Sequence, residues 1–311
     1  MTSPLVSILV PAYNAAPWIT ATLDSALAQT HRPIEIIVVD DGSTDATLAI
    51  ARGFEARGVR VVSQSNAGAS AARNHALLIA HGDYIQFLDA DDLLAPDKIA
   101  VQVARLVDAP SLSLASGRWG RFTTDPLQAQ FDPAPNHRDL SGVEFLQLFF
   151  EHEAMMQPGA WLTPRDLLNA AGPWDESLSL NDDGEYFARV MLLASGIRYC
   201  AAAHVYYRSS LTGSLSRRRD LRALASSFRA TESIVRQLTA ADSSERTHAA
   251  VAYAWKWTAF ELYPEANDLS REAMRRCAVL GGCSRPFPAG PRFQLLAKFL
   301  GWRLAKRLRR A

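Results

Sequence analysis

Short apolar runs alternate with helix-patterned segments over the first third of the 311 residues, and this alternation is the strongest constraint on the fold. The runs lie at 6–10, 34–39, 59–62 and 84–88. Runs without polar alternation are typical of strands that are buried on both faces of a parallel sheet. The order of strand and helix therefore predicts an α/β fold with a doubly wound, mostly parallel sheet and right-handed crossovers.

Beyond about residue 110 this alternation weakens. We expect short strands near 111–122, 161–163 and 198–208 to form a small antiparallel extension of the sheet, with helices near 142–151 and 185–194 beside it. From about residue 220 onward the polar and apolar residues follow a helical period, which predicts a helical C-terminal region.

Composition excludes several classes of protein. With 48% hydrophobic and 21% charged residues, the chain is typical of a globular protein. A formal net charge of +1 gives no global field for nucleic acid, so no nucleic-acid partner is expected. The three cysteines show no metal-binding spacing and favour a reducing, cytoplasmic compartment. The first residues do not resemble a signal peptide, and no apolar window reaches the length of a membrane span.

Polar clusters follow three of the predicted strands at the point where each strand ends. They are Pro11–Asn14, Asp40–Ser43 and Asp89–Asp92. In open α/β sheets, ligands bind at the carboxyl ends of the strands. The fold is therefore expected to bring these three clusters onto one rim.

The cluster Asp89-Ala90-Asp91-Asp92 has three carboxylates that repel one another unless a cation or strong donors intervene. Oxygen ligands select hard ions such as Mg²⁺ or Mn²⁺, which leaves a divalent metal site as one interpretation. The alternative is that Asp91 or Asp92 only stabilises the start of the following helix.

Two further segments suit a nucleotide. Asp40 and Asp41 follow a strand, where an acidic residue often accepts a hydrogen bond from a base or ribose, although one of them could only cap a helix. Asn66 to Gly68 precede a helix that carries Arg73, an arrangement that fits a diphosphate but also an ordinary surface helix. Neither GxGxxG nor GxxxxGK[ST] occurs, so a dinucleotide fold and a P-loop are disfavoured.

Four motifs in this order resemble the family 2 glycosyltransferases. They are Val6–Asn14, Ile37–Asp45, Asn66–Asn74 and Gly82–Asp92, and the resemblance covers roughly residues 5–108. A weaker match continues in three later segments, namely Ala171–Glu176, Asp182–Glu185 and Tyr207–Arg208.

The resemblance implies the GT-A fold, an inverting mechanism and a role for each matching residue. Tyr13 would line the base pocket, Asp41 would contact the base or ribose with Asp40 as the weaker candidate, and Arg73 would help to hold the nucleotide. Asp91 would bind Mn²⁺ or Mg²⁺ directly, while Asp89 would meet the ribose or a metal-bound water. The full set expected at the nucleotide is Pro11, Tyr13, Asp40, Asp41, Asn66, Gly68, Arg73, Asp89 and Ala90.

The family places its general base in a later Glu-Asp-aromatic motif. By position Asp183 is the base, but Asp182 replaces the glutamate and Gly184 the aromatic residue, so Asp182 stays an alternative. An acidic helix N-terminus would produce the same pattern. Some enzymes of this fold take a late histidine as a further metal ligand, which here would be His204; the alternative is a structural histidine.

The implied protein is a hexosyltransferase-like enzyme that moves a sugar from a nucleoside diphosphate, UDP most often in this family, to a saccharide or lipid-linked acceptor in cell-surface polysaccharide or glycoconjugate synthesis. It is expected to be non-processive, because the Gln-x-x-Arg-Trp motif is missing. We expect residues 1–110 to bind the nucleotide sugar, 111–219 to bind the acceptor and carry the base, and 220–311 to be helical. The alternatives are a catalytically inactive nucleotide-sugar-binding module and a metal-dependent phosphohydrolase.

The C-terminal segment is strongly basic. After Glu272 the sequence has ten Lys and Arg residues and no acidic residue. Residues 291–311 combine these cations with apolar residues at helical spacing, which fits a helix on an anionic membrane surface and equally a helix docked on its own domain. The expected location is thus the cytoplasm, with peripheral contact at the inner face of the cytoplasmic membrane as one interpretation.

Overall fold

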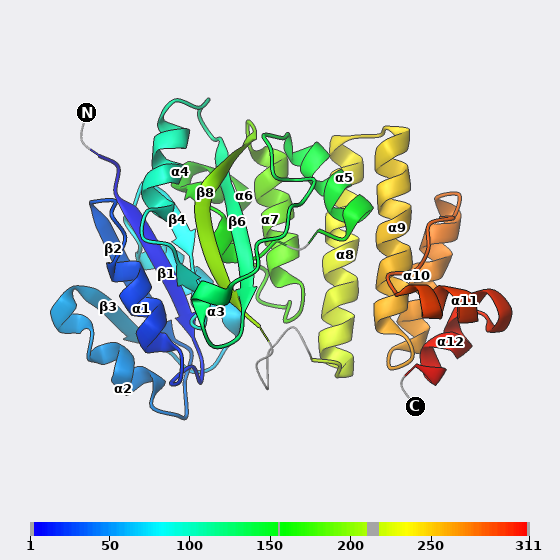
Figure 1. Cartoon of the computed structure of the whole chain (residues 1–311), viewed down its shortest axis with the longest axis horizontal. Helices are drawn as coiled ribbons and strands as arrows, with labels where there is room; N and C mark the ends of the chain where they lie inside the picture. The colour runs from blue at the N-terminus through cyan, green and yellow to red at the C-terminus, as the bar shows by residue number, and fades with distance from the viewer. Residues whose placement is uncertain (1–2, 155, 210–217, 310–311) are drawn as a thin grey trace.

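The computed structural model of the chain describes residues 3–154, 156–209 and 218–309. Its larger sheet has five strands in the order β3-β2-β1-β4-β7 and lies in the N-terminal part of the molecule, at the left of Figure 1. The bounds of these strands are β1 Val6–Ala12, β2 Ile34–Asp40, β3 Val59–Ser63, β4 Tyr84–Phe87 and β7 Thr163–Pro164. β1 to β4 are parallel to one another and β7 is antiparallel to β4, which confirms the predicted mostly parallel sheet.

Pairing in this sheet brings three strand ends to one edge. Ala12 at the end of β1 is paired with Asp40 at the end of β2, and the Asp41 amide then donates to the Ala12 carbonyl at 2.8 Å. On the other side of β1, the Leu88 amide donates to Leu9 at 3.0 Å. The polar clusters that follow β1, β2 and β4 are therefore neighbours, as the strand order requires.

A smaller sheet has three strands in the order β5-β8-β6. Its strands are β5 Leu93–Leu94, β6 Leu114–Phe122 and β8 Ile197–Arg208. β5 pairs with β8 antiparallel, whereas β6 and β8 are parallel, which corrects the expectation that they form an antiparallel pair. The long segment between β6 and β8 contains several helices and provides the crossover that parallel strands need.

Helices pack on both faces of the main sheet, and they give the doubly wound arrangement. Alternate strand residues face opposite cores: Leu9 and Ile37 contact the cluster that includes α7 to α9, and Ile8 and Val38 contact the one that includes α1 and α4. The helix bounds are α1 Ile19–Leu27, α2 Thr47–Arg52, α3 Ala69–Ile79, α4 Lys98–Val107, α5 Gly142–His152, α6 Arg165–Ala171, α7 Asp182–Leu193, α8 Leu221–Ala241, α9 Glu245–Leu262 and α10 Asn267–Val279.

The C-terminal region is helical, as predicted. α8, α9 and α10 extend the molecule away from the main sheet (Figure 1). The expected last helix is two helices, α11 Pro291–Leu300 and α12 Trp302–Leu308, because Gly301 between them has a φ of +74°. Within the ranges described, no helix has both the length and the apolar character that crossing a membrane requires.

α7, which carries Asp182 and Asp183, is positioned by a close contact with α5. Gly142 begins α5 and is buried against the backbone of Met191 on α7. A methyl group at residue 142 would overlap the Met191 carbonyl, so only glycine allows the two helices to approach to this distance.

We therefore expect Gly142→Ala to lower the free energy of unfolding by about 1–3 kcal/mol, as overpacking of a core does. Gly290→Ala is the matched control, because a methyl group there meets no atom within 4 Å and its φ of −67° suits alanine. The control should change stability by less than about 1 kcal/mol. Urea denaturation of both variants measures the difference, and an unchanged Gly142→Ala protein would contradict this account of the α5–α7 contact.

Candidate active site

The loops after β1 and β2 are joined into one rim by Asn14. Its amide donates to Ser43 Oγ at 3.0 Å, and its side-chain oxygen accepts from the Thr44 amide at 2.8 Å. Asn14 has a φ of +49°, which asparagine tolerates better than most residues. Next to it Tyr13 is 51% exposed, so its ring is free to meet a planar ligand at this rim.

Asp41 fixes the loop that leads into α3. The carboxylate is buried and accepts hydrogen bonds from the amides of Ala67 at 2.9 Å and Gly68 at 2.8 Å, and from the Gln64 side chain at 2.8 Å. The Asn66 side chain donates to the Asp41 carbonyl at 2.9 Å. Both carboxylate oxygens of Asp41 thus accept hydrogen bonds from the loop before α3. Its role at a base or ribose stays a prediction.

Asp40 differs from Asp41 in the hydrogen bonds that its two carboxylate oxygens accept. Its Oδ2 accepts from the Ser43 amide at 3.2 Å and from Ser63 Oγ at 3.3 Å. Its Oδ1 is buried and accepts no hydrogen bond from any residue that the structure describes. A buried carboxylate oxygen without a donor is costly, so Asp40 is the member of the pair that a ligand donor would satisfy.

Arg73 on α3 joins the acidic cluster after β4 to the acidic pair at the start of α7. Its guanidinium donates to Asp89 at 2.9 Å and to Asp182 at 2.9 Å, and only 6% of the residue is exposed. Burial opposes the charge, but Asp89 and Asp182 outweigh it and hold the pKa of Arg73 above its ordinary value. Two of the predicted site segments therefore meet at one buried cation.

Trp174 covers this ion-pair cluster. Its ring lies 4.5 Å from the Arg73 guanidinium and stacks on Tyr186 of α7 with centroids 4.0 Å apart. The Asn74 side chain binds both the amide and the carbonyl of Trp174, at 2.8 and 3.0 Å. Trp174 is 2% exposed, so it belongs to the core and shields Arg73 from water.

The remaining carboxylates after β4 are crowded. Burial and the nearby charge of Asp89 raise the pKa of Asp91 to about 6. Burial, with Asp91 next, raises the pKa of Asp92 well above its usual range. Asp92 is fully buried and accepts from the Arg208 amide at 2.8 Å, so it anchors β8 to this loop.

Arg208 at the end of β8 is the second cation at the site. Its guanidinium lies between the rings of Trp18 and Phe122, at 4.6 and 4.4 Å, and donates to the Asp91 carbonyl at 2.9 Å. Because it binds the backbone of Asp91, the Asp91 carboxylate remains available for another cation. His204, four residues earlier, has its ring 4.8 Å from that of Phe131.

Asp91 and Asp89 fit a divalent ion that is shared with a substrate. In the part of the chain that the structure describes, no three His, Cys, Asp or Glu side chains are placed to hold an ion together. Mg²⁺ is commonly held by one or two carboxylates while substrate phosphates complete its shell. Burial, followed by the charge of Asp89, disfavours the charged form of Asp91, and a cation beside this carboxylate would offset both effects, so its chemistry suits such an ion.

The acidic pair of α7 differs in its surroundings. Asp182 is held by Arg73 and by Ser70 Oγ at 3.1 Å, whereas Asp183 accepts from its neighbouring Gly184 amide at 2.8 Å. Burial, followed by the charge of Asp182, raises the pKa of Asp183 to about 7 against the opposing effect of Arg73. Gly184 leaves room for the side chain of Asn181, which a larger residue at 184 would displace.

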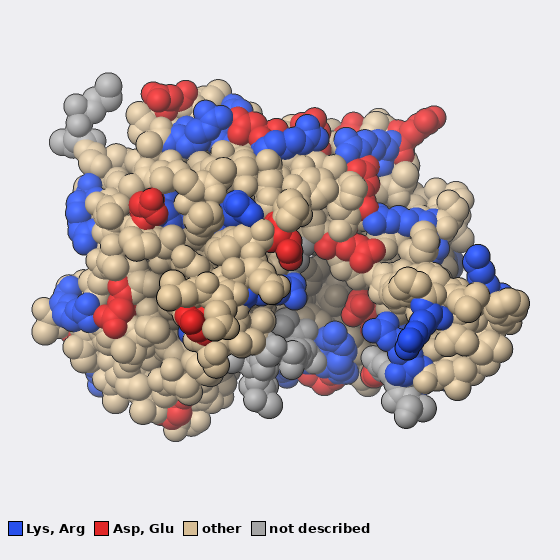
Figure 2. Space-filling view, in the orientation of Figure 1, with Lys and Arg blue, Asp and Glu red and all other residues tan. Residues whose placement is uncertain are grey.

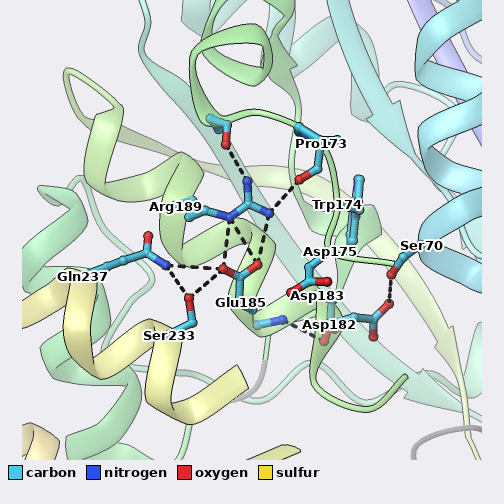
Figure 3. A network of polar contacts seen from close by, with 12 residues as sticks. Ser70, Pro173, Trp174, Asp175, Asp182, Asp183, Glu185, Arg189, Ser233 and Gln237 are labelled. Atoms are coloured by element: carbon cyan, nitrogen blue, oxygen red, sulfur yellow. Dashed lines mark hydrogen bonds and ion pairs between the residues drawn. The ribbon is translucent and has the colours of Figure 1, made fainter. Parts of the chain in front are cut away.

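A polar network on the other side of α7 holds the loop that carries Trp174. Glu185 is buried and accepts from Arg189, and also from Ser233 of α8 at 2.9 Å. Arg189 in turn donates to the Pro173 carbonyl at 2.8 Å. Figure 3 shows the α7 carboxylates turned two ways, Asp182 towards Ser70 and Glu185 towards α8. α7 is thereby fixed between α3 and the helical region.

Comparison with known proteins identifies the family of this site. The sequence profile described as glycosyl transferase family 2 matches residues 7–169, which is more than half of the chain. The chain belongs to glycosyl transferase family 2. Its match includes the clusters after β1, β2 and β4, and the GT-A fold that the motifs implied is confirmed.

Two curated relatives show how far the similarity extends. The succinoglycan biosynthesis protein ExoU of Rhizobium meliloti is 34% identical over an alignment of 268 positions, which covers 78% of this chain and 74% of the relative. An uncharacterized glycosyltransferase of Rickettsia typhi is 31% identical over 193 residues, and the match spans 62% of this chain but only 60% of the relative.

Solved structures share the fold at low identity. S. aureus TarS, residues 1–349 in complex with UDP-GlcNAc, superposes with a TM-score of 0.70 at 17% identity and covers 98% of this chain and 91% of its own. The mannosyltransferase PcManGT from Pyrobaculum calidifontis, in complex with GDP-Man and Mn²⁺, has a TM-score of 0.56 at 19% identity and covers 100% and 85%.

The structure adds residues that sequence reasoning did not assign to the site. Ser70 binds Asp182, and Glu185 with Arg189 holds the loop of Trp174. Ser70 lies one helical turn before Asn74 in the Asn66–Asn74 motif, so its position was readable, but its partner is 112 residues away. The roles predicted for Pro11, Tyr13, Asn66, Gly68, Ala90 and His204 at a ligand remain predictions.

Removing the Arg73 guanidinium should destabilise the protein strongly, because it leaves the partly buried carboxylates of Asp89 and Asp182 without their buried partner. We expect Arg73→Ala to lower the free energy of unfolding by about 3–5 kcal/mol, as the loss of one member of a buried ion pair does. Arg57→Ala is the control, because its pair with Asp24 is about half exposed and such pairs contribute about 0–1 kcal/mol. Equal urea midpoints for the two variants would refute the bridging role of Arg73.

Proposed function

We propose that this glycosyltransferase moves a sugar from a nucleoside diphosphate to an acceptor hydroxyl in a single displacement that inverts the anomeric carbon. The observation that carries the proposal is the Arg73 bridge, since it brings the Asp89–Asp92 cluster and the Asp182–Asp183 pair to one site. An inverting transfer needs only one base and a stabilised leaving group, and both are available from these residues.

Asp183 is the group we assign as the general base. A base works best when its pKa lies near the operating pH, and burial with the charge of Asp182 raises the pKa of Asp183 to about 7. Arg73 and Ser70 both donate to Oδ2 of Asp182, so this carboxylate is held by the fold and is paired with a guanidinium. Asp183 is therefore better suited than Asp182 to take the proton of the attacking hydroxyl.

The leaving nucleoside diphosphate gains negative charge that the site has to offset. Asp91 and Asp89 would hold Mn²⁺ or Mg²⁺, and a bound ion of this kind supplies that positive charge. Support comes from the Mn²⁺ named with the mannosyltransferase PcManGT. Tyr13 and Asp40 are the residues we propose to line the base and ribose, since one is exposed at the rim and the other has a spare oxygen.

Names of similar proteins support a donor and a pathway. TarS is described with UDP-GlcNAc and PcManGT with GDP-Man, so we propose UDP first and GDP second as the nucleotide. ExoU is named for succinoglycan biosynthesis, which supports a saccharide or lipid-linked acceptor in polysaccharide synthesis. Free thiols at all three cysteines support a cytoplasmic location.

Changing Asp183 to Asn should abolish activity while it stabilises the folded protein at alkaline pH. The folded-state pKa of about 7 lies above the ordinary value of 3.8, so the folded state binds this proton more tightly. This proton contributes its full stabilisation below the ordinary pKa of 3.8, and the stabilisation is lost as the pH rises through about 7. Asparagine keeps the acceptor for the Gly184 amide and cannot ionise.

The gain in melting temperature for Asp183→Asn should thus be larger at pH 8 than at pH 5, with Asp108→Asn, an exposed aspartate, unchanged at both. In the unaltered enzyme, kcat/KM for release of nucleoside diphosphate from the donor should fall as pH drops below about 7, where Asp183 is protonated. Full activity of Asp183→Asn would show that another residue is the general base.

Nucleotide binding can be tested without knowing the acceptor. We expect UDP or GDP with Mn²⁺ to raise the melting temperature, because a ligand at 100 times its Kd adds about 2.7 kcal/mol to stability. EDTA and Asp91→Asn should each remove the shift, whereas Asp108→Asn should retain it. A shift without any hydrolysis of the donor would identify an inactive binding module instead of an enzyme, and phosphate release from simple esters without nucleotide would indicate a phosphohydrolase.

A further inference from the structure

Helices α11 and α12 present a group of large apolar side chains to solvent, which we call the outer C-terminal face. It consists of Leu295, Leu296, Phe299, Leu300, Leu304 and Leu308, which are 42–80% exposed. Phe299 is the most exposed of them at 80%. Leu295 and Phe299 are one turn apart on α11, so their side chains share one side of the helix. A cluster of this kind on one short hairpin of helices indicates an interaction surface.

The opposite side of the two helices fixes which residues face outward. Phe293 and Ala305 are buried and form a small core with Phe260 of α9. Lys306 is 7% exposed; its ammonium lies 4.1 Å from the Phe260 ring and donates to the Phe260 carbonyl. One side of the two helices therefore packs on the protein's own domain, which was one of the two interpretations of the sequence. The outer C-terminal face, on the other side, is exposed.

The charges that α11 and α12 themselves carry have a single sign. Arg292, Lys298, Arg307 and Arg309 are exposed on the same two helices and their ends. No acidic residue follows Glu272 in the sequence. Figure 2 shows Lys and Arg side chains at this end of the molecule beside a surface of uncharged residues. Exposed leucine and phenylalanine among arginines and lysines is the composition of helices that lie at an anionic lipid interface.

We propose that the outer C-terminal face docks on an anionic lipid bilayer. A second copy of the chain is the competing occupant, but two such faces brought together would oppose like charges, and the segment offers no carboxylate to pair with them. A bilayer with acidic headgroups supplies both the apolar interior for Phe299 and Leu295 and the negative charge for Arg292 and Lys298. The last two residues of 291–311 lie outside the residues that the structure describes.

Docking on a bilayer would keep the site close to a lipid-linked acceptor. Only this benefit depends on the proposed function; the docking itself does not. In Figure 1 the carboxyl end of β1 and the end of α12 both lie towards the lower edge of the view.

Flotation of the full chain with vesicles tests the proposal in the absence of donor, metal and acceptor. Vesicles of phosphatidylglycerol mixed with phosphatidylcholine should bind the protein, and pure phosphatidylcholine should bind it at least tenfold more weakly. The double variant Leu295→Ser/Phe299→Ser should lose at least tenfold in binding. Arg292→Gln/Lys298→Gln should lose about fivefold for each cation removed, and added salt should weaken binding.

Leu78→Ser/Leu127→Ser is the matched control, because these leucines are 82% and 91% exposed on other parts of the surface. It should bind vesicles like the unaltered protein, and all variants should keep the same melting temperature. Equal binding to both vesicle types, or no binding, overturns the proposal. A dimer in sedimentation analysis that Leu295→Ser/Phe299→Ser converts to a monomer would assign the face to self-association instead. Because no donor is present, failure here leaves the proposed transfer reaction untouched.

Discussion

The buried guanidinium of Arg73 is the interaction on which the site depends. It holds Asp89 from the loop after β4 and Asp182 from α7 at the same distance of 2.9 Å, so two halves of the domain share one cation. Trp174 excludes water above it, which strengthens both ion pairs because the local dielectric is low. The same arrangement leaves Asp183 close to negative charge but without a guanidinium of its own, and this difference is the basis on which we propose Asp183 as the base and Asp182 as its structural neighbour.

Much of the fold could be predicted because its signals are local. Apolar runs without alternation marked β1, β2 and β4, and the polar residues after them followed from the rule that ligands meet strand ends. The partners of Arg73 could not be predicted from pattern, since Asp182 lies 109 residues away. The parallel pairing of β6 and β8 was missed because the sequence of a strand does not show in which direction its neighbour runs. The break at Gly301 was readable, but the spacing of leucines on both sides of it favoured one helix.

Several carboxylates in this site are kept in surroundings that disfavour their charge. Burial is the largest cause that raises the pKa of Asp91, Asp92 and Asp183 alike. A fold tolerates such groups only where the rest of the structure holds them in place, and here that support is aromatic and extensive. Phe87 of β4 packs against Trp174 at 5.2 Å, and Trp174 stacks on Tyr186 of the helix that carries Asp183. The instability of the carboxylates and the rigidity of their support are thus two parts of one arrangement.

The net charge of +1 conceals an uneven distribution of charge along the chain. Asp89 and Asp182 lie beside Arg73, and each of these two ion pairs has a distance of 2.9 Å. The cations that α11, α12 and their ends expose are Arg292, Lys298, Arg307 and Arg309, and they follow the last acidic residue, Glu272. The donor and the bilayer that we propose are both anionic, so positive charge would attract both of them. The Arg73 ion pairs act over a few ångströms inside the fold, whereas salt screens the field of exposed cations within about 8 Å under physiological conditions. The two proposed binding regions can therefore carry their charges independently of each other.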